Sequence, residues 1–117
     1  MAERFLVTYA NFDPSADPRG LEARLGELTT PALAEELRRD SSASAALDDL
    51  RRRNVAFVGQ VVDISVSERS DTRAVVVAVV EHTTVVDDVA QPDFRLVPYT
   101  LTLMPAGSGW VVAGLAQ

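Results

Sequence analysis

The chain has 117 residues, of which 47% are apolar, and its 17 acidic and 11 basic side chains give a net charge of -6. This length suits one domain with its own core, and the acidic balance disfavours nucleic acid or an anionic membrane surface as the main partner, since both select basic patches. Cysteine is absent, which excludes disulfides, thiol nucleophiles and thiolate metal sites.

The first half of the chain carries helical patterns. Apolar side chains at helical spacing over residues 3–12 predict an amphipathic helix that Asp13-Pro14 ends. Asp17-Pro18 and Thr30-Pro31 each place a capping residue before a proline, so they predict the starts of two further helices. A polar break at residues 40–44 precedes a fourth short helix, and we interpret the arginine triplet after it as a solvated helix end.

Strand patterns begin at residue 54 and change phase once. Bulky apolar residues occupy odd positions before Gly59 and even positions after it: Val55 and Phe57, then Val62, Ile64 and Val66. Because a shift of one residue reverses the two faces of a strand, we predict a β-bulge at Gly59-Gln60. The three even residues should then share the buried face with Phe57, and Asp63 should be exposed. The polar residues 67–72 predict a hairpin turn.

The valine-rich stretch from Arg73 to Val86 predicts the central strand, because β-branched residues favour a pleated, half-buried backbone. Both of its alternating sets begin apolar: Ala74, Val76, Ala78 and Val80 on one face, and Val75, Val77 and Val79 on the other. We therefore expect both faces to be covered, by helices of the chain or by a partner outside it.

Two further strands complete the predicted sheet. A long acidic turn over residues 87–93 precedes a strand in which the odd residues from Arg95 to Leu103 face inward, with Pro98 at a bulge or an edge. The turn 105–109 leads to the last strand, from Trp110 to Leu115.

The resulting layout is a single α+β domain over residues 1–117. Helices occupy about residues 2–53, and a curved, four-stranded antiparallel sheet occupies about residues 54–117. In this layout the helices cover one face of the sheet.

Several stretches of this sequence occur together in one known fold. They are the opening Arg4-Phe5-Leu6-Val7-Thr8-Tyr9, the long strands Val55 to Ser67 and Arg73 to Val86, and the close Tyr99-Thr100-Leu101-Thr102-Leu103 with Gly109-Trp110-Val111-Val112. Over nearly the whole chain they resemble the nuclear-transport-factor-2-like cone fold (NTF2-like, cystatin-like), which ketosteroid isomerase shares with many non-enzymatic domains. The helix start Thr30-Pro31-Ala32-Leu33 and the final Gly-Trp-Val-Val are also similar to two groups of domains. These are the extracytoplasmic domains of actinobacterial Mce-associated (mammalian-cell-entry-associated) membrane proteins and the scaffold domains of type IV secretion and conjugation machines. The exclusive use of arginine as the basic residue fits a GC-rich, actinobacterium-like source.

This resemblance implies a scaffold domain that an N-terminal anchor holds outside the membrane, within a multi-protein transport or secretion apparatus. The longest apolar run, Ala74 to Val80, falls far short of the roughly 20 residues that a membrane-spanning helix needs. We therefore expect an extracytoplasmic domain that meets the membrane only through an anchor absent from this chain, with a cytoplasmic domain as the alternative.

Candidate catalytic groups are few. The only histidine, His82, follows Glu81, but adjacent strand residues point to opposite faces, so Glu81 cannot orient it as a general base. One histidine without cysteine does not predict a metal site. An isomerase-like set of Asp63 with Tyr9 or Tyr99 is disfavoured, because Asp63 falls on the polar face of its strand. We expect no catalytic residue, no metal and no cofactor.

Two functional hypotheses remain. The first is a non-enzymatic interaction domain in which an uncovered sheet face, through Val75, Val77 and Val79, binds a second copy or another protein, with a symmetric homodimer as the default. The alternative is a small isomerase-like or dehydratase-like enzyme, or a hydrophobic-ligand-binding protein, that uses the cone interior as its pocket. The candidate pocket residues are Tyr9, His82, Tyr99 and Trp110. A tightly packed interior favours the first hypothesis, and an open cavity with two converging polar groups favours the second.

Overall fold

The computed structural model describes the backbone of residues 1–15, 18–41 and 44–117 and, apart from residues 18–19 and 40–47, their side chains. The described residues form four helices and then four strands: α1 Ala2–Ala10, α2 Pro18–Leu28, α3 Pro31–Ser41, α4 Ser44–Arg52, β1 Val55–Arg69, β2 Ala74–Val86, β3 Val89–Ala106 and β4 Gly109–Ala116. The strands make one antiparallel sheet in the order β1-β2-β3-β4. The predicted α+β class, helices first and an antiparallel meander after, is confirmed.

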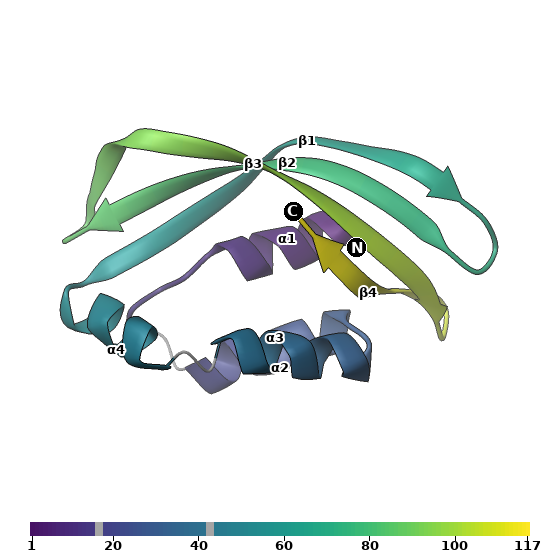
Figure 1. The fold of residues 1–117 in the computed structure, drawn as a ribbon, viewed down its shortest axis with the longest axis horizontal. Helices are drawn as coiled ribbons and strands as arrows, with labels where there is room; N and C mark the ends of the chain where they lie inside the picture. The colour runs from purple at the N-terminus through teal and green to yellow at the C-terminus, as the bar shows by residue number, and fades with distance from the viewer. Residues whose placement is uncertain (16–17, 42–43) are drawn as a thin grey trace.

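The helices lie on one side of the curved sheet. Figure 1 shows the sheet arching over α1, with α2 and α3 side by side in a further layer and α4 near the start of β1. We call the face toward the helices the inner face and the opposite one the outer face. Thr30 begins α3 as predicted, since its Oγ1 accepts a hydrogen bond of 3.3 Å from the backbone N–H of Leu33. The predicted cap of α2, Asp17, lies outside the described residues.

The hydrophobic core lies between α1 and the inner face. Phe5 and Leu6 of α1 are fully buried. They share the core with buried inner-face residues of β2, β3 and β4: Ala74, Val76, Ala78, Val80, Tyr99, Leu101, Leu103 and Val112. The even set of β2 is therefore the inner set, which the sequence left undecided. A bond of 2.9 Å from the N–H of Thr30 to the carbonyl of Val112 ties the start of α3 to β4.

The prediction of a β-bulge at Gly59-Gln60 is wrong. The register of β1 with β2 is regular from Val55 to Val61, and it shifts at Val62 and again at Ser67. Gly59 has a different role: a Cβ there would lie 2.3 Å from the Cβ of Ala10, so glycine permits α1 to approach the strand closely.

The predicted burial of the apolar residues after Gly59 is also wrong. Their exposed fractions are 48% for Val62, 41% for Ile64 and 62% for Val66. Ile64 and Val66 do share the inner face with Phe57, but the far end of the β1–β2 hairpin extends past the helices (Figure 1). Asp63 is exposed, as predicted.

The prediction of a long acidic turn over residues 87–93 is wrong as well, because β3 already begins at Val89. Only Asp87 and Asp88 connect β2 to β3, with φ angles of 49° and 66°. Two positive φ angles match the twist of a tight hairpin, and aspartate tolerates this left-handed region better than most residues. Pro98 faces Val79 without a register shift, and the pairing of β3 with β4 stops at Thr100, so Pro98 lies where β3 is an edge, as predicted.

Candidate functional site

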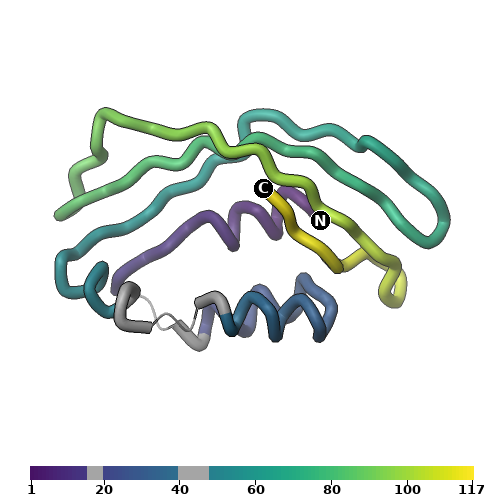
Figure 2. The backbone as a smooth tube through the Cα atoms, viewed as in Figure 1, coloured from purple at the N-terminus to yellow at the C-terminus, as the bar shows by residue number. Residues whose placement is uncertain are grey.

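A cleft of about 1820 Å³ opens between the helices and the inner face of the sheet. Figure 2 shows the backbone of the elements that supply this lining, the arched strands on one side and the helices on the other. Aromatic and aliphatic side chains supply much of its lining: Val7, Tyr9, Phe12, Leu21, Leu25, Leu37, Phe57 and Tyr99. The same lining carries polar groups, among them Asn11, His82 and Arg95. Ten charged residues also line the cleft, so it is richer in polar groups than the usual small-molecule site, which is mostly apolar with a few polar groups.

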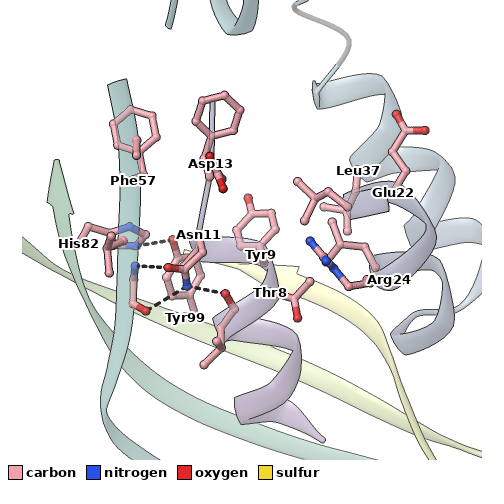
Figure 3. A pocket seen from close by; sticks show the side chains of 18 of the residues that line it. Thr8, Tyr9, Asn11, Asp13, Glu22, Arg24, Leu37, Phe57, His82 and Tyr99 are labelled. Carbon is pink, nitrogen blue, oxygen red and sulfur yellow. Dashed lines mark hydrogen bonds between the residues drawn. The ribbon is translucent and has the colours of Figure 1, made fainter. Parts of the chain in front are cut away.

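The polar centre of the cleft is a pair formed by His82 and Tyr99. His82 lies on the inner face opposite Arg95, and its Nε2 is 3.0 Å from the hydroxyl oxygen of Tyr99. Tyr99 meets Tyr9 edge to face with ring centroids 6.1 Å apart, and Tyr9 stacks on Phe5 at 5.6 Å. Figure 3 shows His82 and Tyr99 on the sheet side of the cleft and Leu37, Glu22 and Arg24 across from them on the helices.

Both members of this pair are held in their neutral forms. Burial, and secondarily the positive charge of Arg95, lowers the pKa of His82 from its usual 6.5. Burial, with a smaller contribution from Tyr9, raises the pKa of Tyr99, and Arg95 opposes this rise. At neutral pH the pair therefore offers an uncharged donor and acceptor. Within the described residues no carboxylate hydrogen-bonds to His82, so the arrangement suits binding a polar group better than abstracting a proton.

Asn11, directly after α1, connects this helix to β1 through hydrogen bonds of its side chain. Its Nδ2 donates to the carbonyl of Gly59 at 3.1 Å, and its Oδ1 accepts from the N–H of Gly59 at 3.3 Å. Phe12 then exchanges two backbone bonds with Phe57, at 2.9 and 3.0 Å. Sequence reasoning missed Asn11, because an asparagine at a helix end predicts only a local cap.

Three of the four candidate pocket residues come together. Tyr9, His82 and Tyr99 line the cleft, whereas Trp110 packs against the core opposite Pro105, at the β3–β4 turn. Asp63 lies on the outer face opposite Val79, so the isomerase-like set of Asp63 with a tyrosine is not assembled. Among the described residues no group of three carboxylate or imidazole side chains is placed to hold a metal ion.

The second candidate surface is the outer face. Val75, Val77 and Val79 lie there, with Val77 38% exposed and the other two partly buried. Phe94 and Leu96 of β3, exposed by 58% and 57%, lie on the same face beside β2. We call the set Val58, Val75, Val77, Val79, Phe94 and Leu96 the outer band. Phe94 and Leu96 were missed from the sequence, although their alternation with Arg95 and Val97 is a signal that could have found them.

Fold and surfaces together define a small α+β domain with an open antiparallel sheet, a cleft beneath it and an uncovered apolar band above it. No helix in the described part of the chain combines the length and apolar character that crossing a membrane requires.

Comparison with protein-family models and with curated protein sequences finds no match. Among solved structures, the chain is similar to a periplasmic fragment of TraM, with a TM-score of 0.76 and 12% identity, over 97% of this chain and 89% of that one. It is also similar to the intermembrane space region of the chloroplast protein ARC6, with a TM-score of 0.54 and 15% identity, over 97% and 86%. At these identities the likeness establishes a shared fold.

Proposed function

We propose that this chain is a non-enzymatic interaction domain, the extracytoplasmic part of a membrane-anchored accessory protein in a transport or secretion complex. Its outer face docks a protein, either another subunit or a second copy of the chain. The observation that carries this proposal is the outer band, which the helices leave uncovered because they all lie on the inner side of the sheet.

The exposed fractions in the outer band argue for a docking surface. Phe94 and Leu96 are each more than half exposed, and on the neighbouring strand β2 they lie opposite Thr83 and Glu81, which follow Val79 on the same face. Burying a large apolar side chain contributes roughly 1.5–3 kcal/mol, so several together supply the centre of a modest interface before the cost of association is subtracted. Exposed apolar side chains that gather on one face of a domain are typical of an interaction site.

The extracytoplasmic location is supported by two independent resemblances. The two similar structures are described as a periplasmic fragment and an intermembrane space region. The sequence patterns resemble extracytoplasmic domains of Mce-associated proteins and scaffold domains of type IV secretion and conjugation machines, within the NTF2-like cone superfamily. Protease treatment of intact cells and of spheroplasts tests this location: the domain should be cut only after the outer barrier is opened, and protection in spheroplasts would contradict it.

Site-specific photo-crosslinking tests the docking surface in cells. A benzophenone side chain at position 77 or 96 should give discrete crosslinked species. The matched control is position 36 on the exposed side of α3, where Glu36 should give none. Equal crosslinking at all three positions, or none at positions 77 and 96, would contradict docking on the outer face.

The cleft favours a second function, the binding of a small apolar ligand with one polar group. An open cavity with two converging polar groups is the feature expected of a ligand-binding domain, whereas a tightly packed interior is expected of a pure interaction domain. The cleft is open, and the polar side chains of His82 and Tyr99 meet in it. We propose this as an additional role, because only Val58 and Phe94 of the outer band also line the cleft, and the other four residues of the band do not.

An anilinonaphthalene sulfonate dye tests this second role. The wild-type chain should enhance the fluorescence of the dye. Ala34→Trp, which adds a bulky ring to the helical wall of the cleft, should reduce this signal. Thr102→Trp adds the same ring on the outer face and serves as the control. A signal that Ala34→Trp leaves unchanged would exclude the cleft as the dye site.

A further inference from the structure

The outer face is acidic as well as apolar. The register of the strand pairs places three carboxylates on this face: Asp63, Glu68 and Glu81. Among the described strand residues, it places no basic side chain there. The arginines of the strands, Arg69 and Arg95, both fall on the inner face. The outer positions of the four strands therefore carry one sign of charge next to the apolar band, and Arg73, which continues this face beyond the start of β2, lies at the far end of the β1–β2 hairpin.

Glu81 occupies the middle of the outer band. It lies opposite Gln60 on β1 and Leu96 on β3, and Val79 is its neighbour on the same face of β2. The residue is partly buried, and none of the ion pairs found among the described residues includes its carboxylate, since they join arginines only to Glu35 and Asp49. A docked protein would remove water from this carboxylate, which is costly without a partner, whereas a guanidinium or ammonium group of that protein would form a strong, charge-assisted hydrogen bond with it.

A second copy of the chain supplies the wrong charge for this position. A two-fold axis through the outer band would bring the Glu81 side chains of both copies into one interface, and neither face contributes a base to neutralise them. Like charges in a desolvated interface oppose association. An anionic lipid surface is disfavoured for the same reason.

We infer that the outer face docks an apolar segment that carries arginine or lysine and belongs to a different protein. This inference rests on the proposed function of the outer face and names the chemistry of its partner. Apolar side chains of that segment cover Phe94 and Leu96, and one of its basic groups pairs with Glu81. Complementary charge then selects the partner, while the outer band supplies most of the buried area.

Selection from a random peptide display library tests the inference without knowledge of the partner. Peptides are selected on the wild-type chain, and those that still bind Leu96→Asp are discarded, which leaves the peptides that use the outer band. Leu96 is 57% exposed, so this substitution leaves the core intact. The retained peptides should be enriched in arginine or lysine over aspartate and glutamate. Glu81→Gln should weaken their binding about tenfold, the change expected when a charge-assisted hydrogen bond is lost.

Glu81→Arg gives the sharper outcome, because the same library selected on this variant should yield acidic peptides instead. Retained peptides without a preference for basic residues, or with binding unchanged by Glu81→Gln, would overturn the inference and leave the outer face as a docking surface. Light scattering that finds a dimer which Leu96→Asp dissociates would overturn it in favour of a second copy. If every selected peptide still binds Leu96→Asp, or no peptide is enriched, both the inference and the docking function of the outer face fail.

Discussion

Replacing Gly59 by alanine tests how α1 is held against β1. The added methyl group would lie 2.3 Å from the Cβ of Ala10, and it would also lie 3.1 Å from the carbonyl oxygen of Ala10. These contacts involve the body of the helix and not the far end of a flexible side chain, so the end of α1 must move away from the strand. That movement also stretches the two hydrogen bonds between Asn11 and Gly59.

The expected cost follows from these contacts. Overpacking by one methyl group in a rigid setting costs about 1–3 kcal/mol, and weakening the two Asn11 bonds adds about 1 kcal/mol. Gly59→Ala should therefore lower the free energy of unfolding by about 2–4 kcal/mol. For a chain of this length, the midpoint of thermal unfolding should fall by roughly 8–15 °C.

Urea denaturation followed by circular dichroism measures the change, and Gly26→Ala is the matched control. Gly26 lies inside α2 with no atom within 4 Å of an added Cβ, so the same substitution there should stabilise the chain by about 0.5–1 kcal/mol through helix propensity. The double variant Ala10→Gly with Gly59→Ala should recover part of the loss, because one of the two clashing methyl groups is gone. If Gly59→Ala had the same free energy of unfolding as the wild type, or if the double variant recovered none of the loss, the close approach of α1 to β1 would be refuted.

Three further predictions concern the core, the cleft and a turn. Leu101→Ala removes a fully buried side chain and should cost about 2–5 kcal/mol in urea denaturation. Leu96→Ala on the outer face of the same strand should cost far less, and equal costs would contradict the assignment of the two faces. His82 has a lowered pKa in the folded chain, so its contribution to stability is present above pH 6.5 and is lost as the pH falls toward the folded pKa. His82→Gln should flatten the stability profile in that acidic window, and an unchanged profile would show that His82 is not buried as described. The paired change Asp87→Asn with Asp88→Gly suits two positive φ angles and should raise stability by about 0.5–1 kcal/mol, whereas a loss would argue against the tight turn.

The sequence determined the kinds of element and the residues that share a face. The alternation from Arg95 to Leu103 placed Tyr99 and Leu101 inward, and the valine-rich β2 was identified as a strand with apolar side chains on both faces. The helices cover only one of these faces, so the expected cover of the other by a partner stays a prediction. Thr30 was identified as a helix cap from its position before a proline. Each of these predictions depends on the geometry of a few consecutive residues, which the order of side chains fixes directly.

The covered faces and the contacts between distant side chains depend on how the whole chain packs. Ile64 and Val66 follow a buried-strand pattern, yet they stay exposed because the β1–β2 hairpin is longer than the helical layer beneath it. His82 and Tyr99 are 17 residues apart in sequence, and their contact depends on the register of β2 with β3. The two-residue turn at Asp87-Asp88 and the register shift between Thr83 and Val85 set this register together. The burial of a sheet face and the contacts between distant side chains depend on the lengths of the elements and on where distant segments dock. The periodicity of the side chains within one element does not specify either of these.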